Sequence, residues 1–237
     1  IPNDRKGGWT DQGENDLRQM PTGTYVSCGV KFNIPENAIN NGNTCIVLGG
    51  AGRPYLPNTS YICIPGTSVS YLYFLHALAW SSGQNGPIGT ITVNYENGTT
   101  QTLPVVNGVD TGNWWIKHSL ANGVIGWEGK NKYSDVALYL SKFKIKNIPI
   151  KNITLNSNGK AVWMIAAISG SRENIPLPTN NETVISADGD WKPYSNIKSI
   201  APGSILDFSF LVDAPAGKYG SVIVANGRFE FEKKPGV

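Results

Sequence analysis

Charged residues are scarce in this chain of 237 residues, because Asp, Glu, Lys and Arg together make up 16% of it. The exposed faces of a helical bundle need many more charges, so the composition argues against a bundle. The 20 basic and 17 acidic residues leave a net charge of +3, spread evenly, which does not indicate a nucleic-acid partner. Long hydrophobic runs are also missing, and we expect neither a signal peptide nor a membrane span.

Histidine is equally scarce, with His76 and His118 the two in the sequence. There is no HExxH zinc motif, no paired CxxC, no G-x-S-x-G elbow and no phosphate-binding loop. His76 lies in an apolar stretch, where a packing role and a site role are both open. Four carboxylates could converge for glycoside hydrolysis, although nothing in their local sequence marks them: Glu96, Asp110, Glu128 and Asp135. We therefore expect a protein that is not an enzyme.

Three cysteines, Cys28, Cys45 and Cys63, lie in the first third of the chain, each beside apolar residues. An odd number leaves at least one thiol unpaired. We expect buried, free cysteines that act as small hydrophobic residues. A Cys28–Cys45 or a Cys45–Cys63 disulfide is the alternative.

What the sequence does contain predicts a folded β protein. It is 40% hydrophobic and 10% aromatic, which excludes disorder, and it has 27 Gly and 15 Pro. Asn-Gly pairs, which suit tight hairpin turns, recur from 41–42 to 226–227. Strands are expected in the runs between the turns: Thr24–Ile34, Tyr61–Ile64, Val69–Ala77, Ile88–Tyr95, Gln101–Val106, Val136–Phe143, Ile150–Asn156 and Ala161–Ile168. Turn signals about ten residues apart are typical of a sandwich or jelly roll.

The composition also suggests how the chain is divided. We expect a β-sandwich over 1–172, a polar linker with two prolines over 173–183, and a short β tail over 184–237. Within the first part, Ile88–Val106 is a predicted hairpin, and in the tail a second hairpin should turn at Asn226-Gly227. The tail is too short to build its own core. It either packs on the first domain or begins a second one.

Four tryptophans beside turn residues are candidate platforms for sugar rings: Trp80, Trp114, Trp115 and Trp127. An indole face is electronegative and attracts the C–H groups of a pyranose, so loop tryptophans could stack on a glycan. Candidate partners for the sugar hydroxyls are His76, Asn113, Lys130 and Asn131. Burial in the core is the alternative for each tryptophan, and we expect it for Trp163.

One segment near the N-terminus, residues 7–18, is dense in oxygen ligands but lacks EF-hand spacing. Asp11, Glu14 and Asp16 are therefore candidate ligands of a structural Ca²⁺, and no other cofactor is expected. The alternative is a hydrogen-bonded loop clamped by Trp9 and Arg18.

The same segment, Gly7-Gly-Trp-Thr-Asp-Gln-Gly-Glu-Asn-Asp-Leu-Arg18, resembles the opening of accessory β-sandwich domains in large secreted bacterial polysaccharide-degrading enzymes. These domains are similar to galactose-binding-like carbohydrate-binding modules. Further pieces that carry the resemblance are Cys45-Ile-Val-Leu48, Tyr73-Phe-Leu-His-Ala77 with Trp80, Ile88-Gly-Thr90 with Val93-Asn-Tyr-Glu-Asn-Gly98, and Asn113-Trp-Trp115. Together they cover about residues 5–170.

The tail resembles the lead-in to the catalytic (β/α) barrel of such glycoside hydrolases, on Pro202–Lys218 and Gly227-Arg-Phe-Glu-Phe231. The resemblance implies a secreted or cell-surface, all-β jelly roll that binds polysaccharide without catalysis. It also implies a catalytic domain C-terminal to this chain, which the jelly roll would hold on the substrate. The rival expectations are a purely structural sandwich that buttresses the barrel, and an enzyme that uses convergent carboxylates.

Overall fold

The structure is a computed structural model that describes residues 9, 15–36, 38, 42–50, 52–81, 85–178, 200 and 217–236. The chain divides into two compact units, Ile1–Val184 and Ile185–Val237. The described residues form antiparallel β-strands joined by turns, and no helix among them is long and apolar enough to cross a membrane. The protein is therefore all-β, as the turn and strand pattern predicts.

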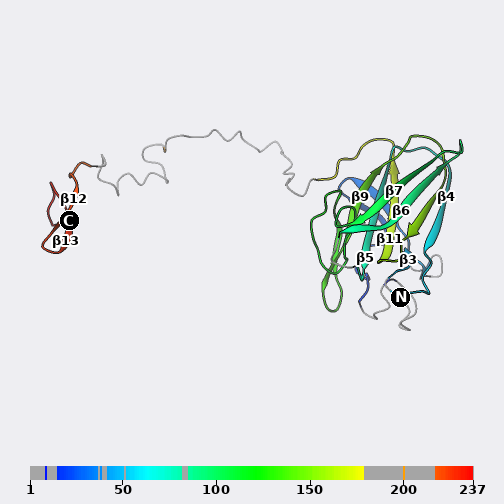
Figure 1. Cartoon of the computed structure of the whole chain (residues 1–237), viewed down its shortest axis with the longest axis horizontal. Helices are drawn as coiled ribbons and strands as arrows, with labels where there is room; N and C mark the ends of the chain where they lie inside the picture. Colours follow the sequence, from blue (N-terminus) through cyan, green and yellow to red (C-terminus); the bar gives the residue numbers. More distant parts are fainter. Residues whose placement is uncertain are drawn as a thin grey trace. The chain divides into compact units, whose positions relative to one another are not determined.

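Unit 1 contains a four-stranded and a five-stranded antiparallel sheet, which pack as a sandwich (Figure 1). The four-stranded sheet has the order β4(Thr59–Thr67), β10(Ile150–Ser157), β6(Gly86–Tyr95), β7(Thr100–Asn107). The five-stranded sheet has the order β3(Ile46–Leu48), β11(Val162–Ser171), β5(Tyr71–Ala79), β9(Asp135–Lys144), β8(Gly123–Lys130). A separate hairpin is formed by β1(Gly23–Ser27) and β2(Val30–Ile34).

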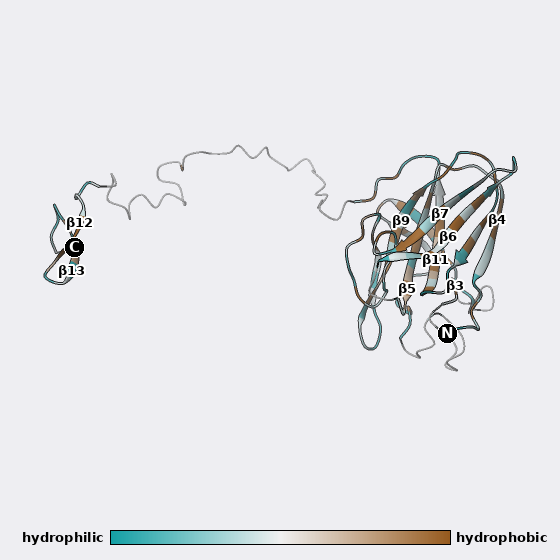
Figure 2. Cartoon of the chain, in the orientation of Figure 1, coloured by the Kyte–Doolittle hydropathy of each residue, from teal (hydrophilic) through white to brown (hydrophobic). Residues whose placement is uncertain are grey.

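The core between the two sheets follows from the alternation of side chains along each strand. Ile91 and Val93 of β6 and Ile153 of β10 are buried against Phe74 and Trp163 of the five-stranded sheet. The polar residues between them face away from the core. Figure 2 shows the resulting mixture of hydrophobic and hydrophilic residues along the strands of unit 1.

The five-stranded sheet is covered on its other face as well. A second buried cluster there joins Leu75 of β5 and Met164 of β11 to Phe32 of the β1–β2 hairpin and to Trp9 and Trp114. Strands buried on both faces need continuous hydrophobic runs rather than alternation. This is why Leu72 to Ala79 are all buried, and why the same stretch is apolar in the sequence apart from His76.

Both predicted hairpins are confirmed. β6 and β7 pair around the turn after Tyr95, within the expected range Ile88–Val106. In unit 2, β12(Val222–Ala225) and β13(Arg228–Phe231) pair around Asn226 and Gly227. Asn226 has a φ of 52° and Gly227 a φ of 76°, as a two-residue turn that matches the strand twist requires.

The predicted strand Thr24–Ile34 is wrong, because this segment is a hairpin. Cys28 and Gly29 have φ values of 48° and 77° and reverse the chain between β1 and β2. The sequence pattern did not indicate this turn, since cysteine is not a usual turn residue. The short strand β3 and the edge strand β8 were also not expected.

All three cysteines are free, as expected, and neither of the alternative disulfides is formed. The expectation that they are buried is wrong for Cys28, which lies in the exposed turn, and for Cys63, which lies on an outward position of β4. Cys45 is half-buried, and burial raises the pKa of its thiol to about 11.

The first residues of the predicted linker belong to unit 1. Ile175 and Leu177 pack against its core. The Tyr73 hydroxyl accepts a hydrogen bond from the Ile175 backbone N–H at 2.8 Å and donates one to the Ile175 carbonyl at 3.1 Å. The chain up to residue 177 is therefore anchored on the five-stranded sheet, although its composition predicts a linker from 173.

Candidate functional site

A loop segment inserted between two strands organises one end of the sandwich. The pairing of β5 with β9 stops at His76 and Tyr139. Beyond that point the Leu78 N–H donates to the Gly112 carbonyl at 2.8 Å, and the Trp114 N–H donates to the Leu78 carbonyl at 2.9 Å. On its other side, the Trp114 carbonyl accepts from the Ala137 N–H at 2.9 Å. The segment 112–114 thus replaces the ladder between the two strands.

Most of the predicted site residues lie at this end of the sandwich. Trp80 follows Ala79, the last residue of β5. Asn113 pairs with Leu78, two residues before Trp80. Lys130 and Asn131 lie at the turn between β8 and β9, next to Asp135 where β9 begins. We call this region the tryptophan end of the sandwich, and it is defined by Trp80, Asn113, Trp114, Trp115, Lys130 and Asn131.

Two of the four predicted stacking residues are buried. Trp114 is 3% exposed and packs edge-on against Trp9 and Trp115, with ring centroids 5.4 and 5.3 Å away. Trp127 is 6% exposed, and its ring lies directly against Gly129. Neither indole face is open to a sugar in this structure, because both rings fill the core beside the five-stranded sheet. Trp114 and Trp127 are therefore core residues, the alternative given for each of these tryptophans.

The other two tryptophans are half-buried. Trp80 has a φ of 53°, and the Arg53 guanidinium lies 3.2 Å from its ring centroid, which covers one face of the indole. Trp115 has its backbone N–H bonded to Asn113 Oδ1 at 2.8 Å, an Asx turn that fixes the loop beside it. The next residue, Ile116, is 65% exposed. These two rings are the remaining candidates for stacking.

His76 is fully buried and is a packing residue rather than a site residue. Its Nδ1 accepts from the Trp163 indole N–H at 3.0 Å, and its Nε2 lies 2.8 Å from Ser141 Oγ and 3.1 Å from the Asp110 carbonyl. Burial lowers its pKa to about 3, against a smaller upward effect of the Asp110 carbonyl. His76 therefore cannot reach the hydroxyls of a sugar at the surface, contrary to the prediction.

The other predicted hydroxyl partners differ in access. Asn131 is 7% exposed, and its Oδ1 accepts from the Tyr133 and Ser134 backbone N–H groups, both at 2.9 Å, so it organises its own turn. Lys130 is exposed, and its backbone N–H is bonded to Gln19 Oε1 at 2.6 Å. Asn113 is half-buried. Lys130 therefore offers the most accessible polar group of the set.

The four carboxylates that could have formed a hydrolytic pair lie in different surroundings. Asp110 is buried and accepts from the Val106 N–H at 2.8 Å and from Asn122 Nδ2 at 2.6 Å. Burial raises its pKa. Glu128 lies 3.5 Å from Lys117. Glu96 follows the end of β6, whereas Asp135 begins β9 at the tryptophan end.

The proposed calcium ligands lie mostly outside the described residues, since Asp11 and Glu14 are not among them. Asp16 is paired with Arg18, whose Nη2 lies 2.7 Å from Oδ2, and this pairing lowers the pKa of Asp16. In the part of the chain that the structure describes, no group of three or more His, Cys, Asp or Glu residues is placed to hold a metal. Asp16 therefore favours the clamped-loop alternative.

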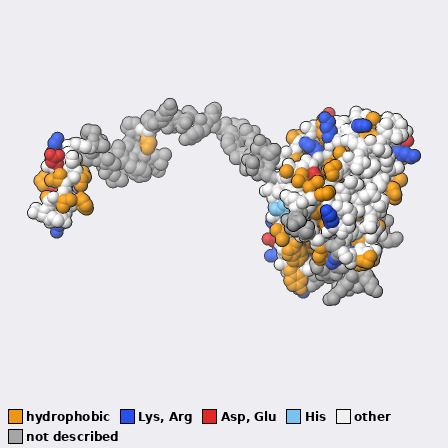
Figure 3. Space-filling model, in the orientation of Figure 1, with side chains coloured by type: hydrophobic (Ala, Val, Ile, Leu, Met, Phe, Trp, Pro, Cys, Tyr) orange, Lys and Arg blue, Asp and Glu red, His pale blue; other side chains and the backbone are white. Residues whose placement is uncertain are grey.

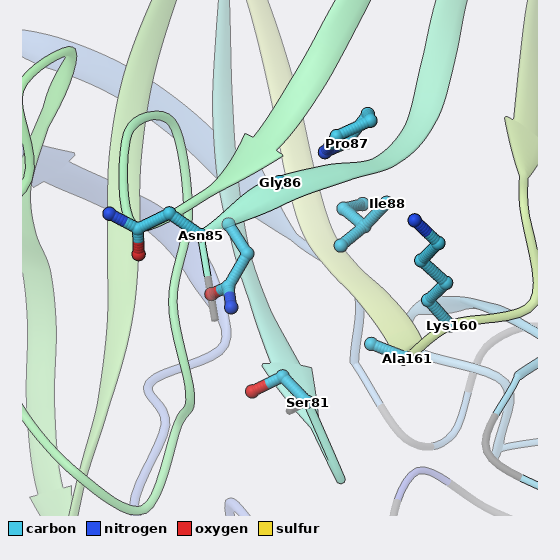
Figure 4. A pocket seen from close by; sticks show the side chains of 8 residues that line it. Ser81, Asn85, Gly86, Pro87, Ile88, Lys160 and Ala161 are labelled. Carbon is cyan, nitrogen blue, oxygen red and sulfur yellow. The ribbon is translucent and has the colours of Figure 1, made fainter. Parts of the chain in front are cut away.

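A small cavity opens where the two sheets meet at this end (Figure 4). Its volume is about 70 Å³, far below the volume of a site that encloses an organic ligand. The residues that line it are Ser81, Asn85, Gly86, Pro87, Ile88, Asn107, Lys160 and Ala161. A sugar could touch its mouth but could not be enclosed.

A second polar surface was not predicted from the sequence. It is the outer face of the four-stranded sheet, which we call the Thr/Asn face. Its residues are Thr59, Tyr61, Cys63, Thr90, Thr92, Asn94, Thr100, Thr102, Pro104, Asn152, Thr154 and Asn156. The alternation of Thr90, Thr92 and Asn94 is visible in the sequence. Which strands lie beside it is not.

No protein-family model matches the chain, and no curated protein matches it in sequence. The strand pairing by itself shows that unit 1 consists of two antiparallel sheets packed as a sandwich, with a small additional hairpin.

Proposed function

We propose that unit 1 binds polysaccharide without catalysing a reaction on it, and that it holds an attached glycoside hydrolase on its substrate. The observation that carries the proposal is the gathering of Trp80, Trp115, Asn113 and Lys130 at one end of the sandwich. We also propose that unit 1 is a jelly roll of the galactose-binding-like family.

The chemistry of this end supports a glycan ligand. In this proposal sugar C–H groups stack on the half-buried indole of Trp115, and the exposed Lys130 ammonium and the Asn113 amide are donors for hydroxyls. The cavity at this end of the sandwich is too small to enclose a sugar. A polymer lying across the surface therefore fits better than an enclosed monosaccharide, and repeated attachment along the polymer would raise a modest affinity.

The side chains of unit 2 are consistent with the proposal that a catalytic domain is attached to this chain. Its hairpin strands have exposed hydrophobic side chains, with Val222, Val224 and Phe229 at 59%, 68% and 78% exposure. An isolated two-stranded hairpin is at best marginally stable in water, so these side chains suit a larger neighbouring fold. The tail's resemblance to the lead-in of a (β/α) barrel names that fold. A protein of this kind would act outside the cell.

A purely structural sandwich is the second candidate, and a specific observation favours it. Trp114, Trp127 and His76, three of the eight residues predicted to contact sugar, are used for packing. If Trp80 and Trp115 also serve packing alone, the sandwich would only buttress its neighbour.

Affinity electrophoresis and tryptophan emission separate the two candidates. We expect soluble polysaccharides to retard the full chain and to shift its emission, and Trp115→Ala to weaken binding about tenfold, as the loss of one aromatic contact implies. Phe229→Ala, which removes an exposed ring from unit 2, is the matched control. Neither retardation nor an emission change with any polymer would favour the buttress. New reducing ends in the incubated polymer would instead support the hypothesis that the chain is a glycoside hydrolase.

A further inference from the structure

We propose that the Thr/Asn face is a second binding surface, which takes an extended chain of a neutral polysaccharide. The inference takes the class of ligand, a polysaccharide, from the proposed function. It adds a second site for this ligand, away from the tryptophan end. The argument comes from the order, the charge, the hydrogen bonding and the residue types of this face.

The register of the four strands sets the side chains in three rows of four. The rows are Cys63, Asn152, Asn94 and Thr100; Tyr61, Thr154, Thr92 and Thr102; and Thr59, Asn156, Thr90 and Pro104. Strands lie about 4.8 Å apart and alternate residues about 6.8 Å apart, so the array is about 14 Å long in each direction. All twelve side chains are exposed or half-buried, so a ligand longer than one sugar ring could lie across them.

The array contains no charged residue, and nine of its twelve positions are Thr or Asn. Lys151, at the bulge in β10, stands at its border. Nucleic acids and anionic polymers are bound through Lys and Arg, which this face lacks. Hydroxyl and amide groups instead match the hydroxyls of a neutral sugar chain. Figure 3 shows that backbone and uncharged polar side chains make up most of the visible surface of unit 1.

Hydrogen bonds within the array hold its side chains in place. Asn94 Nδ2 donates to Asn152 Oδ1 at 2.7 Å and to Thr154 Oγ1 at 3.3 Å. Thr59 Oγ1 donates to Asn156 Oδ1 at 2.9 Å. Each Asn amide has two donor hydrogens and two acceptor lone pairs, so these bonds use only part of its capacity. A ligand would meet side chains whose rotamers are already fixed, which lowers the entropic cost of binding.

The residue types are not explained by strand stability. Thr suits a strand, but Asn is depleted in strands. Asn94, Asn152 and Asn156 nevertheless occupy positions in β6 and β10, the two central strands of this sheet. Residues that oppose local preference without a packing gain are expected at functional surfaces. Tyr61, 72% exposed on the edge strand β4, adds an aromatic ring to the same face.

Cys63 provides a reporter for this face that is independent of the tryptophans, because it lies within the array and its thiol is exposed. Cys28→Ser removes the other exposed thiol, and Cys45 reacts slowly since burial raises its pKa to about 11. The full chain carrying this substitution is treated with iodoacetamide in galactomannan, xyloglucan or mixed-linkage β-glucan. Polygalacturonate is the anionic comparison.

We expect at least one neutral polymer to slow alkylation of Cys63. At a concentration about ten times the value for half-maximal retardation, mass action predicts about tenfold protection. Tyr61→Ala should weaken this protection about fivefold, as the loss of one aromatic contact implies, while Phe229→Ala should leave it unchanged. Polygalacturonate should protect less than the neutral polymers.

The outcomes separate this inference from the proposed function. Retardation and a change in tryptophan emission, with Cys63 alkylated at its free rate, would overturn the second surface and leave the tryptophan end standing. Protection of Cys63 that persists in Trp115→Ala would support the second surface, and retardation that is unchanged in Trp115→Ala would remove the tryptophan end. Protection that is lost equally in Tyr61→Ala and Phe229→Ala would count against the inference, and so would the absence of any effect of any polymer.

Discussion

Trp163 donates its indole N–H to Nδ1 of His76 over 3.0 Å, inside the core between the two sheets. The bond sets the tautomer of the histidine, because a nitrogen that accepts a hydrogen bond carries no proton. The proton is therefore on Nε2, which donates toward Ser141 Oγ and the Asp110 carbonyl. The inserted loop 108–122 is thereby tied to β5, β9 and β11 through one neutral imidazole.

This arrangement predicts a loss of stability in acid. The pKa of His76 is about 3 in the folded chain and 6.5 as its ordinary value, so between these pH values the unfolded chain binds a proton that the folded chain does not. The free energy of unfolding should fall as the pH falls from about 6.5 to about 3, by about 1.4 kcal/mol per pH unit. Chemical denaturation at several pH values measures it.

The substitution His76→Gln isolates this effect. The variant should be less stable at neutral pH, because Trp163 loses its partner, but the difference from the wild type should shrink as the pH falls. His118→Gln, which removes the histidine outside this network, is the matched control. A constant difference between wild type and His76→Gln across this range would contradict the assignment.

The turn at Cys28 and Gly29 predicts a stabilising substitution. Cys28 has a φ of 48°, a left-handed conformation that costs most residues about 1–2 kcal/mol and that Asn adopts more readily. Cys28→Asn should therefore raise the free energy of unfolding by about 0.5–1 kcal/mol. Cys63→Asn, the same change in the extended strand β4, should give no such gain. Equal effects at the two sites would argue against a turn-specific cause.

Two glycines of β6 should respond differently to alanine. A Cβ at Gly89 would overlap the backbone carbonyl of Asn156 in the neighbouring strand β10, whereas a Cβ at Gly86 would meet open space. We expect Gly89→Ala to destabilise unit 1 by about 3 kcal/mol, because a backbone atom cannot move aside cheaply. Gly86→Ala should be neutral or slightly stabilising. Thermal melts of the two variants test the register of β6 with β10.

The anchoring of residues 173–178 rests on Tyr73. Tyr73→Phe leaves the Ile175 N–H and carbonyl without this hydroxyl and should lower the free energy of unfolding by about 1–2 kcal/mol. Tyr61→Phe, at an exposed ring, should change it by less than about 0.5 kcal/mol. An unchanged stability in Tyr73→Phe would mean that this segment is not part of the folded unit.

The sequence by itself determined the all-β class and the two hairpins that turn at Asn97-Gly98 and at Asn226-Gly227. It could do so because turn propensity and period-two alternation act between residues close in the chain. It failed at Cys28, where a turn formed on a residue with little turn preference. It also could not assign the tryptophans beside turns, because a neighbouring glycine does not reveal which side of a loop faces water.

Only the tertiary structure decided which polar groups share a surface. Insertion of residues 112–114 between β5 and β9 buried Trp114, and the covering of the second face of the five-stranded sheet buried Trp127. The pairing of β10 with β6, strands more than fifty residues apart in the sequence, created the Thr/Asn face. Such contacts depend on strand order and register, which local residue preferences do not encode.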